Sequence, residues 1–440
     1  MTSFSRNSLA LAVALSSSIV TGIAQAQNAT EPQLSPEMEA KLRVLVEQLV
    51  QQKLAEREKV LADSRPPEKV DSLQPAETKA KASPKAESTA NLIDEITEKV
   101  KIYGLFDYGL TYVSNEGGNS KLSARDGVNY GNRIGLSGSQ DLDYGLKAIF
   151  TLEHGFYLND GTITQNGKTW GRQAFAGLQH EKYGTLTVGR QYDFIWDYLT
   201  QLNIGGYAST YAGHSGDLDR ISGWRVDRSI KYQSPDYDGF KFGVMYGSDE
   251  PAYAGQNTGD SKTVSFGATY ANKDWGLSGA YVKVDNSAIY PEFQIGVQEL
   301  FGKPLPFNGT PTIVDQEIGI VGGFYQLGKT TLVANTALVR LTQDGERADQ
   351  HVYEIGGLYP FTAKTSGILA YQYSEFEDHD FNQFTFGLKH DITPKFWAYA
   401  SYSILRASGD ILANQGAGFY LDNSTTNHQD TARVALVYKF

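Results

Sequence analysis

Apolar and polar side chains alternate with a period of two over most of the chain from residue 99 to residue 440. The pattern is clearest in residues 431–440, where Arg433 and Lys439 share one face of the predicted strand. The opposite face carries Ala432, Val434, Leu436, Tyr438 and Phe440. Side chains of a β-strand point alternately to its two faces, so this pattern predicts an amphipathic strand. An apolar face opposite a charged one is typical of a lipid-facing barrel strand, although a strand of a soluble sandwich can alternate in the same way.

Short and long polar segments alternate along this region. Short breaks rich in Asp, Lys, Gly and Pro occur near Asp143, Lys182, Asp238, Lys273, Gly328, Thr362 and Thr393. Longer polar stretches lie near Asn115, Asn159, Ala208, Asn257, Phe301, Asp344, Asp378 and Asn423. These connections join about 16 strands of ~10 residues, and an even strand number puts both ends of a barrel on the side of the short turns. The sequence therefore predicts an all-β fold, an antiparallel transmembrane β-barrel over residues 99–440 whose short turns face the periplasm.

The composition agrees with a barrel and excludes several other classes. The 440 residues include 45 glycines, 27 tyrosines and no cysteine, and the mean hydropathy is −0.37. Because barrel strands alternate, their average hydropathy resembles that of a soluble protein. The absence of cysteine excludes disulfides and thiolate metal sites, and a net charge of −11 argues against nucleic acid as a partner. No two histidines have a metal-binding spacing, so we expect no metal and no cofactor.

The amino-terminal part predicts targeting followed by a periplasmic extension. Arg6, an apolar run over residues 9–20 and a small-residue site at Ala24 and Ala26 predict a signal peptide over residues 1–26, cleaved after Ala26. A helical apolar stripe within residues 27–62 consists of Met38, Leu42, Leu45, Val46, Leu49 and Val50. This stripe fits a coiled coil among subunits or a lone amphipathic helix. Residues 63–98 are a Pro-, Ala-, Lys- and Glu-rich linker, which Pro66 and Pro67 keep from being helical.

Several ordered segments carry a resemblance to a known family. They include N-R-I-G-L-S-G at 132–138, G-L-K-A-I-F-T-L-E at 145–153, G-R-Q-A-F-A-G-L at 171–178, G-T-L-T-V-G-R-Q at 184–191, R-V-D-R-S-I-K-Y-Q-S-P at 225–235 and D-G-F-K-F-G-V-M-Y-G at 238–247. On these residues the chain resembles the general porins of Gram-negative outer membranes. The resemblance implies a homotrimer in outer-membrane lipid and a water-filled channel for passive diffusion of ions and small hydrophilic solutes. It also implies that the aromatic end, Phe440 with Tyr438, is the signal read by the barrel-assembly machinery.

The resemblance also implies a pore constriction, in which an inward-folded third loop faces arginines on the wall. Arg133, Arg172 and Arg225 match the arginines of the family's wall, and Arg190, Lys147 and Lys231 are further candidates from strand parity and position. The longest connection, residues 191–224, is the expected constricting loop, beside small inward residues at Ala174 and Ala176. Its acidic candidates are Asp193, Asp197, Asp217 and Asp219, although the family's acidic P-E-F signature is missing from this loop. Opposed charges across a neck create a transverse field that orients water and polar solutes.

Two other classes of function compete with the channel. The chain could be a structural envelope protein whose extension binds the cell wall and whose barrel is an anchor. It could also be an outer-membrane hydrolase, but no serine or aspartate with histidine repeats a recognisable catalytic motif. The sequence therefore favours a diffusion channel and no enzyme activity.

Deleting residues 27–98 distinguishes the two roles of the extension. If the extension is a tether, the variant should lose cosedimentation with cell wall while its conductance stays intact. If the extension is a trimerisation device, the oligomer should instead lose heat stability on a gel. A variant that keeps both properties would exclude both roles.

Overall fold

The computed structural model describes residues 99–249, 261–305, 309–408, 411–418 and 421–440. The predicted signal peptide (1–26), helix (27–62) and linker (63–98) lie outside the described residues. Within the described ranges, no helix has both the length and the apolar character needed to cross a membrane.

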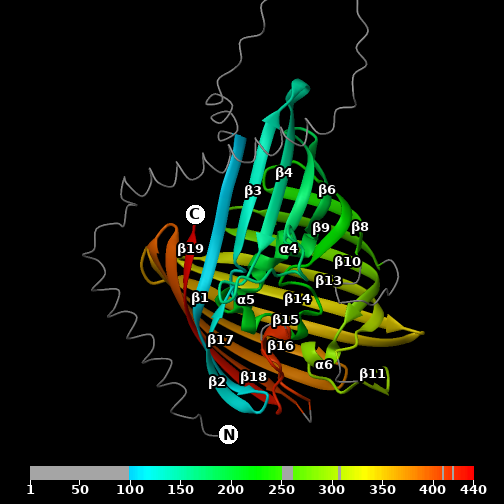
Figure 1. The fold of residues 1–440 in the computed structure, drawn as a ribbon, viewed down its shortest axis with the longest axis vertical. Helices are drawn as coiled ribbons and strands as arrows, with labels where there is room; N and C mark the ends of the chain where they lie inside the picture. Colours follow the sequence, from blue (N-terminus) through cyan, green and yellow to red (C-terminus); the bar gives the residue numbers. More distant parts are fainter. Residues whose placement is uncertain (1–98, 250–260, 306–308, 409–410, 419–420) are drawn as a thin grey trace, which may run out of the picture. The chain divides into compact units, whose positions relative to one another are not determined.

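One antiparallel sheet closes on itself and forms the barrel (Figure 1). The ring closes where β19 pairs with β1. Although the sheet contains 17 strands, β2 and β3 share one position, because they pair with different parts of β1. The described residues therefore form the 16-stranded antiparallel barrel that the sequence predicts, and that prediction is confirmed.

The strands have the following bounds: β1 (Val100–Glu116), β2 (Asn119–Asp126), β3 (Arg133–Asp141), β4 (Leu146–Gly155), β5 (Gln173–His180), β6 (Gly184–Tyr192), β7 (Arg225–Gln233), β8 (Phe240–Asp249), β9 (Ser261–Ala271), β10 (Trp275–Ile289), β13 (Thr312–Leu327), β14 (Thr330–Gln343), β15 (Glu346–Pro360), β16 (Thr365–Phe376), β17 (His379–Thr393), β18 (Phe396–Ala407) and β19 (His428–Lys439), with the small outer hairpin β11 (Glu299–Leu300) and β12 (Lys303–Pro304). The short helices are η1 (Asp143–Gly145), α4 (Phe194–Leu199), η2 (Thr200–Leu202), α5 (Ile204–Ala208), η3 (Thr210–Ala212), η4 (Ser215–Asp217), α6 (Pro291–Gln294) and η5 (Gln415–Gly418).

The connections at the two ends of the barrel only partly follow the predicted lengths. All the short turns predicted from the sequence join consecutive strands. However, the stretches near Asn115, Asp344 and Asp378, predicted as long loops, are two-residue hairpin turns. Asp344 and Gly345 have φ angles of 52° and 87°, the left-handed conformation that a tight type I′ hairpin requires. The flanking strands therefore continue further toward the outer side than the polar composition indicates.

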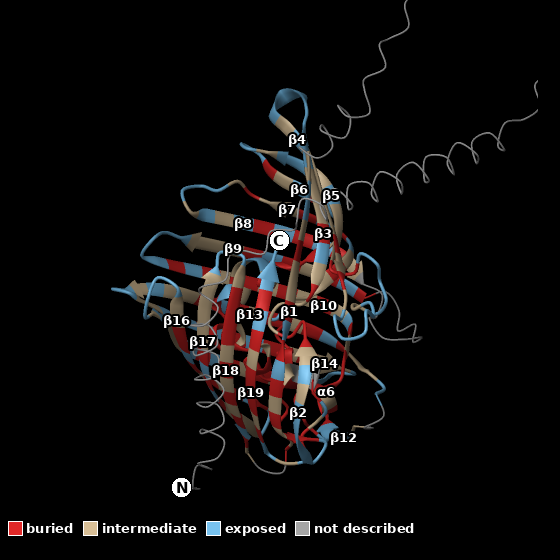
Figure 2. Cartoon of the chain, turned by 60° about the vertical axis from the view of Figure 1, so that its left-hand side comes forward, coloured by how far each residue is buried: buried red, intermediate tan, exposed pale blue. Residues whose placement is uncertain are grey.

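The two faces of the wall alternate as the period-two pattern predicts. On β8, the outward side chains of Phe242, Val244 and Tyr246 are exposed, whereas the inward residues Gly243 and Met245 are buried. Figure 2 shows buried and exposed residues following one another along the strands. The main apolar core lies on the inner face, where the connection between β6 and β7 packs against the wall.

The second barrel strand is interrupted. β2 pairs with β1 from Tyr108 to Glu116, and β3 pairs with β1 from Val100 to Leu105. Between them, residues 127–132 leave the sheet, and we call this segment the strand-2 turn. It begins at Gly127, whose φ is 64° and whose N–H donates to the Asp107 carbonyl at 2.7 Å.

A buried ion pair joins the strands at the closure. Arg433 of β19 donates to the Asp107 carboxylate of β1 at 2.8 Å, to the Tyr399 hydroxyl of β18 at 2.7 Å and to the Thr111 hydroxyl at 3.0 Å. The side chains of Arg433 and Asp107 have no exposed surface. An unpaired buried charge is strongly destabilising, so the pair specifies the register of the β1–β19 closure.

The last residue also pairs with the first strand. The Phe440 N–H donates to the Gly104 carbonyl at 3.1 Å, and the Phe440 ring lies 5.5 Å from the Phe106 ring. A Cβ at Gly104 would lie 2.2 Å from the Phe440 ring. Glycine at this position therefore makes room for the aromatic end at the barrel edge.

Candidate functional site

The interior of the barrel is narrowed by loop 3, which we define as residues 193–224. Figure 1 shows α4 and α5 of this loop inside the barrel. α4 packs against β8, β9, β10 and β13, and α5 packs against β15, β16 and β17. Loop 3 therefore covers the inner wall from β8 to β17 and leaves the wall from β3 to β7 facing the lumen.

The inward turn of loop 3 begins with a helix cap. Asp193 accepts hydrogen bonds from the backbone N–H groups of Ile195 and Trp196 at 3.0 and 3.3 Å and so caps α4. The next residue, Phe194, is fully buried, and its N–H donates to the Ser265 hydroxyl on β9 at 3.2 Å. Polar capping and apolar burial together direct the chain onto the inner wall.

Glycines on the inner wall make room for the apolar side chains of loop 3. A Cβ at Gly243 would lie 2.1 Å from the Phe194 ring, and a Cβ at Gly387 would lie 2.7 Å from the Ala208 Cβ. The other glycines that loop 3 approaches in this way are Gly267, Gly322 and Gly356. The sequence instead predicts Ala174 and Ala176 as the small residues beside the loop, but these lie on β5, away from the wall that loop 3 covers.

Amide side chains on the same wall bind the backbone of loop 3. Each of the strands β13–β17 contributes one side-chain NH₂ group that donates to a loop carbonyl. The bonds run from Gln316 to Leu218 (2.6 Å), Asn335 to Leu202 (2.7 Å), Gln350 to Ser215 (2.8 Å), Gln372 to Gly213 (3.2 Å) and Gln383 to Gly213 (3.1 Å). Because a buried carbonyl without a partner costs free energy, these bonds allow an irregular segment to lie inside the barrel.

A buried charged group fastens the middle of loop 3 to β15. The Glu354 carboxylate accepts the N–H groups of Ile204 and Gly205 at 3.1 and 2.8 Å. His214 lies 2.5 Å from Asp219 and 3.4 Å from Glu354. Burial alone would lower the pKa of His214, but the charge and hydrogen bond of Asp219, with those of Glu354, raise the pKa to about 10. The imidazolium therefore links two carboxylates within the protein.

Two further aspartates of loop 3 are buried inside the loop. Burial raises the pKa of Asp193 to about 6. Burial and the charge of Asp219 raise the pKa of Asp217 to about 7. The Asp217 carboxylate accepts from the N–H and the hydroxyl of Ser222. These carboxylates stabilise the fold of loop 3 and do not reach the lumen.

The part of the wall that loop 3 leaves uncovered carries a connected group of arginines around Glu153. The Arg172 guanidinium donates to the Glu153 carboxylate at 2.7 Å, and an Arg133 nitrogen lies 3.8 Å from the same carboxylate. The Tyr103 hydroxyl donates to it at 3.0 Å. One carboxylate therefore holds two arginines from separate parts of the chain side by side.

Tyr192 extends this group to a third arginine. Its hydroxyl accepts hydrogen bonds from Arg172 at 3.2 Å and from Arg225. The Arg225 guanidinium also lies over the Tyr192 ring, 4.4 Å from its centroid, and the ring stacks on Trp196 of loop 3 at 4.3 Å. Arg133, Arg172 and Arg225 thus form one continuous basic wall beside the start of loop 3.

Three further basic side chains near this group are paired with carboxylates. Arg190 and Lys168 both bind Asp227, each at 2.5 Å. Lys231 binds Asp197 at 2.5 Å. These pairs place carboxylates next to the basic wall rather than across the lumen from it.

The structure brings together most, but not all, of the predicted constriction residues. Arg133, Arg172 and Arg225 are joined through Glu153 and Tyr192, and Lys231 binds Asp197 of loop 3. Arg190 binds Asp227, and Lys147 pairs with Asp141 at 3.3 Å near a short turn. Because Asp141 and Arg133 lie at opposite ends of β3, Lys147 lies away from the arginine group. Among the four acidic candidates, Asp193, Asp217 and Asp219 are buried, and only Asp197 has a partly exposed side chain. The predicted row of carboxylates facing the arginines is therefore not formed by these four residues.

Several residues of the site are not among the sequence predictions. Tyr192 and Asp227 hold arginines, and the amides on β13–β17 hold loop 3. The amides had a signal in the sequence, because they occupy inward positions of otherwise apolar alternating strands. No feature of the sequence pointed to Tyr192, because a tyrosine at the end of a strand is common in a barrel.

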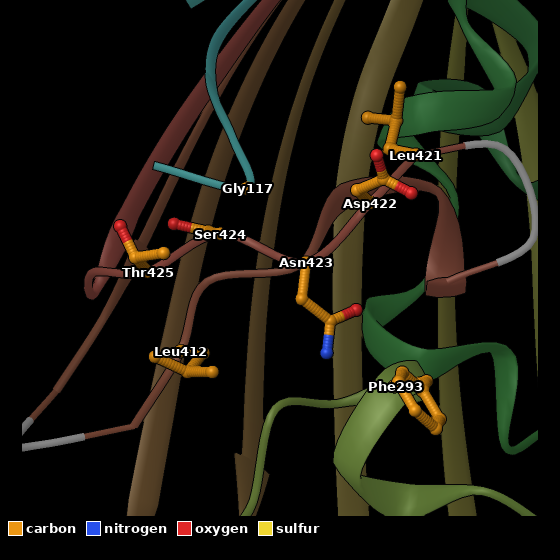
Figure 3. Close-up of a pocket in the computed structure, with 8 residues that line it drawn as sticks. All are labelled: Gly117, Phe293, Leu412, Leu421, Asp422, Asn423, Ser424 and Thr425. Carbon is orange, nitrogen blue, oxygen red and sulfur yellow. The ribbon is translucent and has the colours of Figure 1, made fainter. Parts of the chain in front are cut away.

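A separate pocket of about 490 Å³ lies among the outer loops (Figure 3). Phe293, Leu412 and Leu421 contribute apolar surface, and Asn423 and Asp422 contribute polar surface. The Asn423 side chain donates to the backbone carbonyl of residue 292 at 3.1 Å. The pocket is therefore a joint between outer loops, remote in sequence from the basic wall.

The pairing of His214 predicts a pH dependence of stability. The folded-state pKa of about 10 exceeds the ordinary 6.5, so the stabilisation is complete below pH 6.5 and is lost as the pH rises through about 10. The free energy of unfolding in detergent should fall over this window, and His214→Gln should flatten the fall. His180→Gln, at the end of β5, serves as the control and should behave like the wild type. Equal pH slopes in all three proteins would contradict this role of His214.

Known proteins resemble both the sequence and the fold of this chain. The family model described as Gram-negative porin matches residues 80–410. An outer membrane porin protein of Bordetella pertussis is 32% identical over 210 residues, which are 43% of this chain and about half, 54%, of that relative. Outer membrane porin F of Escherichia coli is 25% identical over 370 residues, 80% of this chain and 94% of the relative. The solved anion-selective porin from Comamonas acidovorans has a TM-score of 0.64 at 20% identity, covering 78% of this chain and 99% of that one. The chain thus belongs to the Gram-negative porin family and is an outer-membrane β-barrel that forms a passive diffusion channel.

Proposed function

We propose that this channel passes ions and small hydrophilic solutes with a preference for anions, and that Arg133, Arg172 and Arg225 set the preference. The supporting observation is the basic wall beside loop 3. Among the described residues at this wall, four are basic, Arg133, Arg172, Arg225 and Lys231, and two are acidic, Glu153 and Asp197. The excess of basic side chains gives the neck a positive charge.

The physical basis is the field of fixed charges in a narrow water-filled passage. Charges on low-dielectric walls focus the field into the lumen and raise the local concentration of ions of opposite sign. Three of the four loop 3 aspartates are buried, so they contribute little to the opposing face. The field of the basic wall therefore attracts anions without a matching acidic row that would guide cations.

Replacing two wall arginines should move the selectivity toward cations. In Arg133→Ala/Arg172→Ala, Glu153 loses both cationic partners, so the neck loses two positive charges and exposes one negative charge. Under a tenfold salt gradient, the reversal potential should shift by a sizeable part of the ~59 mV that a perfectly selective pore can develop. The measurement is made on the purified protein in a planar bilayer.

Lys147→Ala is the matched control, because it removes a basic inward side chain that lies away from the neck. It should leave the reversal potential near the wild-type value. If the double arginine variant keeps the wild-type reversal potential, the arginines do not set the selectivity. If folded wild-type protein gives no conductance steps, the channel itself is refuted.

We further propose that the channel works as a homotrimer without cofactor or catalytic activity, and that Phe440 with Tyr438 is recognised by the barrel-assembly machinery. The pairing of Phe440 with Gly104 at the closing edge supports this role, because the aromatic end lies where the last strand completes the barrel. The roles of residues 27–98 in trimer assembly or cell-wall contact stay predictions.

Deleting Phe440 should lower the amount of folded protein in the outer membrane, since the recognition signal is lost. Molecules that do insert should keep the wild-type reversal potential, because the basic wall is unchanged. Tyr359→Ala removes an exposed aromatic side chain from the end of another strand and is the control. Normal insertion without Phe440 would refute the assignment.

A further inference from the structure

The strand-2 turn contacts loop 3 inside the barrel. We propose that Asn129 in this turn is a positioning residue, which holds loop 3 to the second barrel strand and so sets the opening of the neck. The proposal rests on the proposed function of the neck. It assigns a role to a segment that interrupts the second strand.

The Asn129 side chain makes two hydrogen bonds to the backbone of loop 3. Its NH₂ group donates to the Ala208 carbonyl at 3.0 Å, and its carbonyl oxygen accepts the Thr210 N–H at 2.9 Å. An asparagine carries a donor and an acceptor at the end of one short side chain, which aspartate, serine and alanine cannot provide together at this reach. The residue type is therefore matched to both bonds.

The two bonded groups flank a point where loop 3 changes direction. Ser209 lies between α5 and η3 and has an extended backbone, with φ −157° and ψ 128°. The carbonyl before such a residue and the N–H after it point to the same side, as in a parallel strand pair. Asn129 thus binds loop 3 as a neighbouring strand would, at the segment between its two helical parts.

The strand-2 turn is fixed to the barrel wall by hydrogen bonds to Asp107 and by packing of Tyr130. The backbone N–H groups of Asn129 and Tyr130 donate to the Asp107 carboxylate at 2.8 and 3.0 Å. The same carboxylate is paired with buried Arg433. The Tyr130 ring packs edge-on against the Trp397 ring at 5.4 Å. Because the turn is fixed by charge and packing, it can serve as a rigid support for loop 3.

This contact adds a second support for loop 3 beside the wall amides, because Asn129 and Tyr130 lie next to Gly387 of β17 and Tyr399 of β18. The amides that bind loop 3 lie on β13–β17, whereas Asn129 lies between β2 and β3. Nearby, the hydroxyls of Thr111 on β1 and Tyr211 of loop 3 lie 3.3 Å apart. Loop 3 is therefore fastened along β13–β17 and again at the first two barrel strands.

The same turn also positions the basic wall. Arg133 directly follows the turn, and its guanidinium donates to the Gly131 carbonyl at 2.8 Å. A Cβ at Gly131 would lie 2.7 Å from the Arg172 guanidinium. One short segment therefore places both the inner edge of loop 3 and two arginines of the neck.

The test compares Asn129→Ala with the full wild-type chain in planar bilayers. The single-channel conductance step should increase, and neutral polyethylene glycols that the wild type excludes should enter the pore, because loop 3 loses both hydrogen bonds to the strand-2 turn at residues 208–210. Heat stability of the folded barrel should stay near the wild-type value, which a purely structural residue would not allow. Asn129→Asp, which keeps only the acceptor, should give an intermediate step.

Asn115→Ala is the matched control, because Asn115 binds Thr425 and Thr426 among the outer loops. It should leave the single-channel conductance step and the size of the excluded polymer unchanged. A folded Asn129→Ala channel with the wild-type step and polymer exclusion would overturn the inference while leaving the channel function intact.

A second variant decides the question even if Asn129→Ala does not fold. The chain has no cysteine, so Asn129→Cys/Thr210→Cys introduces a single thiol pair at the contact. Oxidation should restore the wild-type step, and reduction should enlarge it reversibly. Identical steps in the oxidised and reduced forms would overturn the inference.

Discussion

The hydrogen bonding of the loop 3 backbone to the inner wall is the interaction on which the neck depends. An irregular segment inside a barrel exposes N–H and C=O groups that a regular strand would pair. Here side-chain amides of β13–β17 and the Glu354 carboxylate supply the partners. The loop can therefore bury its apolar side chains against the wall, and the barrel acquires a core within its own lumen.

The charges at the neck follow from where the loop is anchored. The buried carboxylates of loop 3, Asp193, Asp217 and Asp219, bind backbone N–H groups, a serine hydroxyl and His214 within the loop. A carboxylate on the open wall, such as Glu153, is instead close to arginines and orients them. The same residue types thus stabilise the loop on one side and arrange the basic wall on the other.

The alternation of side chains was sufficient to predict the barrel, because each strand of a membrane barrel has one face in lipid and one inside. It also assigned Lys147 and Lys231 to the inner face by strand parity, whereas Arg133 and Arg225 were predicted from the family resemblance. Strand parity has no meaning in an irregular loop, so it could not tell that Asp193 is a helix cap and that Asp219 binds His214. The polar composition near Asp344 indicated a loop, but Asp-Gly there forms a tight hairpin between longer strands.

The glycines that receive loop 3 have a consequence for the evolution of pore size. The apolar side chains of loop 3 fit against the inner wall because five wall residues have no side chain: Gly243, Gly267, Gly322, Gly356 and Gly387. A single added methyl group at one of them would push a particular part of the loop toward the basic wall. The calibre of such a channel can therefore be adjusted in small steps, each at a different depth along the loop, while every charged residue of the neck stays the same.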